Sequence, residues 1–211
     1  RQMCIRDRYI GRIFVGRERG IVRINIINIT PLVFVLSSLI FPDGTIQETA
    51  STKRSPVILG DSTVMSPGQG YGIDTGYPYN AHINGQRAST VINYVEWAST
   101  QGDLLVFNAG IHDAAWGTPL DEYKNTLRDI VNDARGFGIL VIFATSLIQP
   151  EHDVTPYNAA AVSVMYEIHV PVYDINQHAI EISDDDVHMT PESTAIVGGG
   201  LRDWLLRNFV G

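Results

Sequence analysis

The stretch Pro56-Val-Ile-Leu-Gly-Asp-Ser-Thr63 joins a short apolar run to a glycine and three polar residues. An apolar run of this length that ends in glycine is typical of a strand buried on both faces of a parallel sheet. Further along the chain, three more apolar runs of similar length follow: 103–108, 138–144 and 170–175. The sequence therefore predicts four buried strands.

Helical patterns separate these strands. Apolar residues recur at helical spacing within 89–99, 121–135 and 156–168, and Gly136 is suited to end the second of these helices. A last helix starts at Thr190 with a threonine cap followed by proline, and we expect it to continue to about residue 208. Alternating strands and helices indicate a three-layer α/β/α sandwich, in which ligands bind beyond the carboxyl ends of the strands.

The composition excludes several classes of protein. The chain has 211 residues, 45% of them hydrophobic, and a net charge of −8. This charge argues against nucleic-acid binding, which needs clustered Lys and Arg. The single cysteine, Cys4, excludes an intramolecular disulfide and a multi-cysteine zinc site. We expect one monomeric domain over residues 55–211.

The residues before this domain have a different character. Residues 1–20 lack a clear period, and we interpret them as a non-native or disordered leader. Within 21–54, basic residues precede the apolar run 31–41, which is too short for a stable membrane span but suits a secretory signal over about 23–41. This interpretation predicts a secreted or periplasmic protein. The alternative is a buried strand, which would leave the protein cytoplasmic.

Three residue types that can cooperate in catalysis lie where the sequence predicts ligand binding, beyond the carboxyl ends of the strands. Ser62 follows the first strand, and Asp185 and His188 precede the last helix. His188 would take the Ser62 proton and return it to the leaving group, while Asp185, three residues earlier, would accept from His188 Nδ1–H. The backbone N–H of Ser62 would face a developing oxyanion. These residues predict a serine hydrolase.

The acidic run 184–186 also has a metal-binding interpretation, because carboxylates bind Ca²⁺ or Mg²⁺. Adjacent carboxylates point in different directions, however, and no glycine-bearing calcium loop surrounds them. We therefore expect neither a metal nor another cofactor, and we expect Asp184 and Asp186 to be solvated. The aromatic residues Tyr71 and Trp116 flank the predicted site, where they could stack on a sugar ring or pack the loops.

Four short blocks resemble those of the GDSL-type, or SGNH, hydrolases. They are Gly60-Asp61-Ser62, Asn84-Gly85, Gly110-Ile-His112-Asp113 and Asp185-x-x-His188. They fall in the family's order, and the resemblance covers residues 56–210. It implies a flavodoxin-like parallel sheet, with Ser62 as nucleophile, Asp185 and His188 as its catalytic partners, and no cofactor.

The resemblance also implies an oxyanion hole made by Ser62, Gly85 and the residue at position 112. This chain departs from the family there, because His112 stands where the family has asparagine. A neutral imidazole still offers one N–H donor, so His112 could keep the role, with a pH dependence that asparagine lacks. Candidates for contact with substrate are Asp61, Asn84, Asp113 and His152, of which Asp113 is better suited to holding its loop.

The resemblance implies hydrolysis of a carboxylic ester through an acyl-serine intermediate. Gly60-Asp-Ser-Thr63, Gly70-Tyr-Gly72 and the stretch 84–89 are similar to blocks of bacterial carbohydrate acetylesterases, which implies removal of acetyl groups from a sugar. One alternative is a lipase or thioesterase with the same machinery. Another is a catalytically inactive carbohydrate-binding domain, since His112 departs from the pattern.

Overall fold

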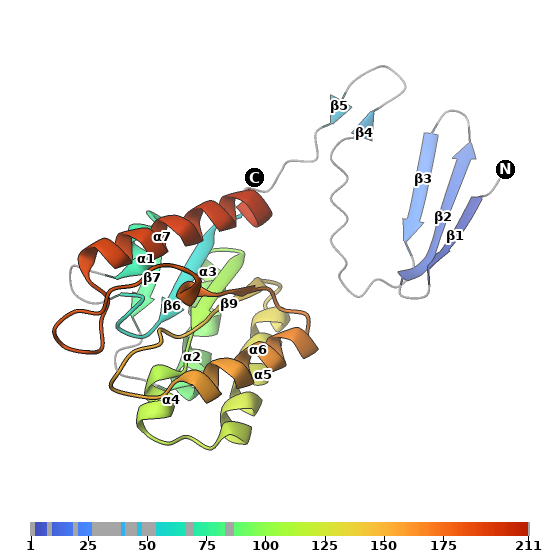
Figure 1. Cartoon of the computed structure of the whole chain (residues 1–211). Helices are drawn as coiled ribbons and strands as arrows, with labels where there is room; N and C mark the ends of the chain where they lie inside the picture. Colours follow the sequence, from blue (N-terminus) through green and yellow to red (C-terminus); the bar gives the residue numbers. More distant parts are fainter. Residues whose placement is uncertain are drawn as a thin grey trace. The chain divides into compact units, whose positions relative to one another are not determined.

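The computed structural model describes residues 54–65, 70–82 and 87–210, and before them the backbone of five strands (Figure 1). The chain divides into two compact units, Arg1–Thr52 and Lys53–Gly211. The strands of the first unit are β1 (Met3–Asp7), β2 (Ile10–Glu18), β3 (Ile21–Ile26), β4 (Leu39–Ile40) and β5 (Ile46–Gln47). The first three form an antiparallel sheet, and the other two form an antiparallel pair. Residues 27–38 lie outside the described residues, so the predicted leader and signal-like segment stay predictions.

The second unit is built on a parallel sheet of five strands. They are β6 (Pro56–Gly60), β7 (Tyr79–His82), β8 (Leu104–Asn108), β9 (Leu140–Ala144) and β10 (Val172–Tyr173). Their order across the sheet is β10-β9-β8-β6-β7, and every neighbouring pair is parallel. Numbered within this unit, the order is 5-4-3-1-2, which is the flavodoxin-like arrangement. The fold class predicted from the sequence is confirmed.

Helices connect these strands. They are α1 (Tyr71–Asp74), α2 (Ala88–Val91), η1 (Ile92–Tyr94), α3 (Val95–Gln101), α4 (Ile111–Ala115), α5 (Leu120–Gly136), α6 (Thr155–Glu167), η2 (Ile175–Gln177), α7 (Pro191–Leu205) and the π-helical turn η3 (Leu206–Val210). Alternate strand residues face opposite sides of the sheet. Val57 and Leu59 join a core with α2, α3, α5 and α6, whereas Ile58 joins a core with α1 and α7. The helices therefore form the outer layers, as Figure 1 shows.

Glycines let α7 approach its neighbours. A Cβ at Gly198 would lie 2.6 Å from Tyr71 O and from Asp74 Cβ, and one at Gly200 would lie 2.5 Å from His178 Cε1. These distances are too short for real side chains, so α7 packs against α1 and the turn at His178 only because these positions are glycine. The helix runs through both glycines without a break.

Three details of the sequence-based prediction are wrong. Strand β7, at the edge of the sheet beside β6, was not predicted. The helix expected to stop before Gly136 includes it, and the left-handed residue that follows is Gly138, with φ +76°. The strand expected over 170–175 ends at Tyr173, because Ile175 begins η2.

None of the helices in the described part of the chain is both long and apolar enough to cross a membrane.

Candidate active site

A tight turn after β6 presents Ser62. The carbonyl oxygen of Asp61 accepts from the N–H groups of Val64 at 3.1 Å and Met65 at 3.3 Å. A Cβ at Gly60 would lie 2.3 Å from Val64 Cγ2, so only glycine allows the chain to fold back this closely. Asp61 and Thr63 are buried, and Ser62 between them is partly exposed. The turn therefore offers the Ser62 hydroxyl to the outside.

Asp61 holds this turn from within. Its side chain is only 3% exposed, and Oδ1 accepts from the backbone N–H of Thr63 at 2.9 Å and from the Thr63 hydroxyl at 2.6 Å. Among the described residues, no group donates to Asp61 Oδ2. Its carboxylate is therefore placed to shape the turn, and the contact with substrate that the sequence suggested for Asp61 stays a prediction.

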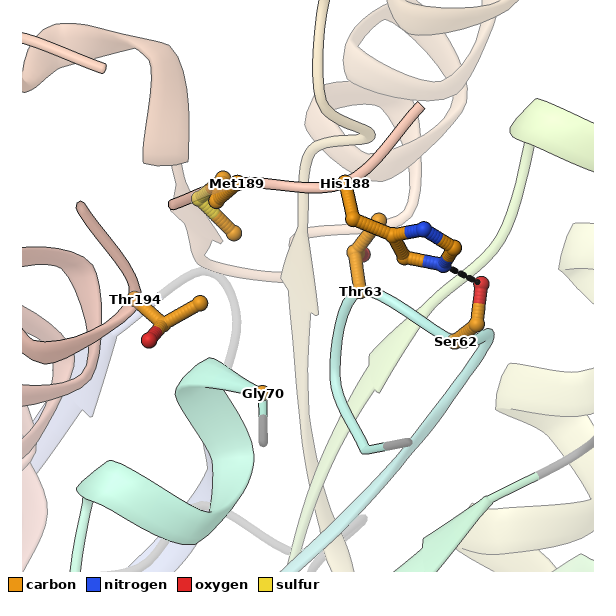
Figure 2. A pocket seen from close by; sticks show the side chains of 6 residues that line it. All are labelled: Ser62, Thr63, Gly70, His188, Met189 and Thr194. Atoms are coloured by element: carbon orange, nitrogen blue, oxygen red, sulfur yellow. Dashed lines mark hydrogen bonds between the residues drawn. The ribbon is translucent and has the colours of Figure 1, made fainter. Parts of the chain in front are cut away.

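His188 reaches Ser62 from the loop before α7. Its Nε2 lies 2.8 Å from Ser62 Oγ, across 126 residues of sequence (Figure 2). The loop doubles back on itself, with Ser183 N–H donating to His188 O at 2.8 Å and Ile182 bridged to Met189. Two residues after His188, the side chain of Thr190 accepts from Ser193 N–H and caps α7, as the sequence predicted. The imidazole is thus held between a closed turn and a capped helix.

Asp185 orients the imidazole. Its Oδ2 lies 2.6 Å from His188 Nδ1, while Oδ1 accepts from His188 N–H at 2.8 Å, Val187 N–H at 3.0 Å and the Ser183 hydroxyl at 2.7 Å. These bonds, above all the one from His188 N–H, hold the pKa of Asp185 well below its usual range. An ionised Asp185 can only accept, so Nδ1 carries the proton and Nε2 is left to accept from Ser62 Oγ.

The neighbouring acids have no part in this geometry. Asp184 and Asp186 are exposed, and Asp186 adopts a left-handed conformation with φ 60° that closes the turn. Within residues 54–65, 70–82 and 87–210, no group of three or more His, Cys, Asp or Glu side chains could hold a metal ion.

The loop after β8 carries His112 at the start of α4. Gly110 has φ +143°, and a Cβ there would lie 2.7 Å from Ser146 Oγ. Just before it, Ala109 O accepts from the hydroxyls of Tyr123 at 2.7 Å and Ser146 at 2.9 Å, so the loop is held tightly. His112 Nε2 is covered and has no hydrogen-bond partner among the described residues. Because β6 and β8 are parallel neighbours, the loop that carries His112 and the turn that carries Ser62 follow the same edge of the sheet.

Asp113 fastens α4 to the helix that follows the predicted glycine block. Its side chain is 1% exposed, and Oδ2 accepts from Ala88 N–H at 2.9 Å. Burial raises the pKa of Asp113, against the lowering effect of that hydrogen bond. The carboxylate is therefore placed to hold its loop, the better suited of the two roles that the sequence left open. Asn84 and Gly85 of the glycine block lie outside the described residues.

The fourth candidate for substrate contact is His152. It lies in the loop after β9, with Nε2 3.8 Å from Glu151 Oε1. No described hydrogen bond joins it to Ser62, Asp185 or His188. Its contact with substrate stays a prediction.

A small pocket opens beside the Ser62 hydroxyl, with about 170 Å³ of empty space that is partly open to solvent. Figure 2 shows the six side chains that line it: Ser62, Thr63, Gly70, His188, Met189 and Thr194. In the sequence, Thr63 and Gly70 stand out only as parts of blocks similar to those of acetylesterases, and neither Met189 nor Thr194 is predicted as a site residue. The glycine at position 70 is the feature that the sequence offered. The structure requires it, because φ is +128° and a Cβ there would lie 2.5 Å from Val64 O. Met189 is the neighbour of His188 in sequence, but Thr194 is brought there only by the first turn of α7.

No protein-family model matches this chain, and no curated protein matches its sequence. Solved structures do resemble it. A family 3 carbohydrate esterase from Clostridium thermocellum is 15% identical with a TM-score of 0.61, over 74% of this chain and 98% of that one. A variant of an acetyl-xylooligosaccharide esterase from a Geobacillus species is 17% identical with a TM-score of 0.57, over 72% and 93%.

A third similar structure is a GDSL-like lipase from Bacteroides thetaiotaomicron, 17% identical with a TM-score of 0.58, over 72% of this chain and 87% of that one. At these identities the likeness concerns the fold, and in each case it extends over most of the other protein. The unit Lys53–Gly211 has the fold of the GDSL-type, or SGNH, hydrolases, the family whose sequence blocks it resembles.

Proposed function

We propose that this protein is a serine esterase that hydrolyses carboxylic esters through an acyl-serine intermediate. One observation carries the proposal. His188 Nε2 lies 2.8 Å from Ser62 Oγ while its Nδ1 lies 2.6 Å from Asp185 Oδ2. A general base must lie within about 2.6–3.2 Å of the atom whose proton it takes, and a third group must orient it. Both conditions hold in this geometry.

In the proposed reaction, Ser62 Oγ attacks the ester carbonyl carbon as His188 Nε2 takes the hydroxyl proton. The tetrahedral intermediate collapses when His188 returns that proton to the departing alkoxide, which leaves an acyl group on Ser62 and a free alcohol. A water molecule, deprotonated by His188, then attacks the acyl-serine and releases the carboxylic acid. Asp185 stays ionised throughout and stabilises the imidazolium that forms in each half of the reaction.

The oxyanion of each intermediate needs donors. We assign this role to the backbone N–H groups of Ser62 and Gly85 and to the imidazole of His112. The support for His112 is its place at the sheet edge beside β6 and its Nε2, which has no partner among the described residues. Such a nitrogen can serve a developing charge without first giving up another hydrogen bond.

For the substrate, we favour a short acyl group on a carbohydrate. The pocket beside Ser62 is small, partly open to solvent and lined by only six described residues, which suits a short acyl group. Two proteins of similar fold are a family 3 carbohydrate esterase and an acetyl-xylooligosaccharide esterase. The alternative of a lipase has the GDSL-like lipase of similar fold in its favour. A long acyl chain would need an apolar groove, whereas the lining of this pocket includes two threonines and a serine.

Turnover of p-nitrophenyl acetate by the purified protein and by Ser62→Ala tests the reaction. We expect Ser62→Ala to hydrolyse the ester no faster than the uncatalysed background. Equal rates of the variant and the wild type would refute the proposed esterase activity. A series of p-nitrophenyl esters from acetate to octanoate tests the acyl group. We expect kcat/KM to fall with chain length, and a rise towards octanoate would favour the lipase instead.

Two further expectations remain proposals. We propose that the protein is a monomer and that the segment over about 23–41 directs its export. Sedimentation of the purified chain at micromolar concentration tests the first, with a dimer as the contrary result. Fusion of residues 1–54 to a reporter enzyme that works only outside the cytoplasm tests the second, and an inactive fusion would contradict it.

A further inference from the structure

Trp116 is exposed in a way that folding does not explain. It caps the C-terminal end of α4 and is 65% exposed, whereas Trp204 packs on Tyr173 at 5.4 Å and on Phe209 at 5.2 Å between ring centroids. The guanidinium carbon of Arg87 lies 5.2 Å from the centroid of the Trp116 ring. Among the described residues, Arg87 forms no ion pair with an acid. An exposed indole and a partly exposed guanidinium, whose charge also lowers the pKa of Asp113, thus form one surface, which we call the Trp116–Arg87 surface.

This surface is tied to the element that carries His112. Trp116 N–H donates to His112 O at 3.0 Å, and four residues of helix place Trp116 only about 6 Å further along the axis. Arg87 directly precedes Ala88, and the Ala88 N–H donates at 2.9 Å to Asp113, which belongs to α4 like His112. The two side chains therefore project from backbone that is joined by a buried hydrogen bond. Arg87 follows β7 and Trp116 follows β8 and α4, and β7 and β8 are the two strands that flank β6, after which Ser62 comes.

The chemistry of the surface suits a sugar. The C–H groups of a pyranose ring carry partial positive charge and pack on the negative face of an indole. A guanidinium offers five N–H donors in a plane, which can bind the hydroxyl or carboxylate oxygens of the same ring. A long acyl chain would use neither the donors nor the charge.

We propose that Trp116 and Arg87 form a subsite that binds a sugar ring of an acylated oligosaccharide while its ester group lies at Ser62. The inference rests on the proposed esterase function and adds to it the residues that select the alcohol part of the substrate. Arg87 keeps the indole ring in place and donates to the sugar oxygens, and Trp116 provides the stacking face.

The test compares two substrates, an acetylated xylooligosaccharide and p-nitrophenyl acetate, which lacks a sugar. The quantity measured is the ratio of their kcat/KM values. We expect Trp116→Ala to lower this ratio roughly tenfold, the scale of one lost aromatic contact, and Trp116→Phe to keep most of it. Tyr166→Ala is the matched control, because Tyr166 is 86% exposed but lies on α6, and it should leave the ratio unchanged.

An unchanged ratio in Trp116→Ala would overturn the subsite, and so would an equal loss on both substrates, which would mark Trp116 as structural. A second measurement separates this proposal from the esterase itself. Binding of a xylooligosaccharide to Ser62→Ala, followed by calorimetry, should weaken roughly tenfold when Trp116→Ala is added. If wild type and Ser62→Ala turn over esters equally, the proposed esterase function is wrong. The binding measurement does not depend on turnover, so it still supports or overturns the proposed subsite.

Discussion

At the scale of single residues, the Asp185 carboxylate takes part in four hydrogen bonds of the candidate site. One oxygen accepts from two backbone N–H groups and the Ser183 hydroxyl, and the other faces His188 Nδ1. The same side chain therefore closes the turn and chooses the imidazole tautomer. These two roles can be tested separately, because asparagine has nearly the same shape as aspartate but carries no charge.

We expect Asp185→Asn to lower kcat on p-nitrophenyl acetate by about 10³–10⁴-fold, because the amide can donate to Nδ1 and so favour the wrong tautomer. KM should change little, since no substrate contact is lost. Circular dichroism of the variant serves as the control for folding. A rate within tenfold of the wild type would show that Asp185 does not orient His188.

The acid stability of the fold should also depend on Asp185. Its pKa in the folded chain lies below the value of about 3.9 expected for an unfolded chain. Its hydrogen bonds therefore stabilise the fold fully above that pH, and this stabilisation is lost as the pH falls through the folded pKa. The Tm difference between wild type and Asp185→Asn should be largest near pH 7 and smaller at pH 3. A difference that grows on acidification would contradict the assignment.

His112 gives a prediction that distinguishes a donor from a packing residue. Removing one oxyanion donor costs about 10²–10³ in kcat, so His112→Ala should lose activity on this scale. His112→Asn replaces the imidazole by another N–H donor and should recover much of the loss. Equal activities of the alanine and asparagine variants would exclude a donor role. The measurement is kcat at a pH where the wild type is fully active.

At the scale of elements, α7 packs closely against α1, and Gly198 lies at a close contact between them. We expect Gly198→Ala to destabilise the fold by about 1–3 kcal/mol, because its Cβ would lie 2.6 Å from Tyr71 O and Asp74 Cβ. Gly199 is the matched control, since a Cβ there meets nothing within 4 Å. Gly199→Ala should stabilise the helix by up to about 1 kcal/mol. Urea unfolding of both variants checks this, and similar effects would contradict the close packing.

At the scale of the whole molecule, both hydrophobic cores consist of residues from Val57 to Val210. They belong to the unit Lys53–Gly211, and this unit also contains Ser62, Asp185 and His188. We expect a chain that begins at Lys53 to fold cooperatively and to keep kcat/KM on p-nitrophenyl acetate within about twofold of the full chain. Loss of cooperative unfolding in the shorter chain would show that residues 1–52 complete a core.

Most of the sheet could be predicted because its central strands are buried on both faces. Leu104 to Asn108 and Leu140 to Ala144 are nearly continuous apolar runs, which is the pattern that two covered faces require. The edge strand Tyr79–His82 was missed, because it is short and carries asparagine and histidine. Its pairing with β6 places it in the sheet, and its own four residues form no apolar run that would predict a strand.

The candidate site divides in the same way. By itself, the sequence determined that Ser62 follows a strand and that Asp185 and His188 share a turn before a capped helix, since strand period and helix capping depend on consecutive residues. Only the tertiary structure decided the 2.8 Å between His188 Nε2 and Ser62 Oγ, and the exposure of Trp116. Both depend on which distant segments pack together, and neither distance nor exposure is a property of neighbouring residues in the chain.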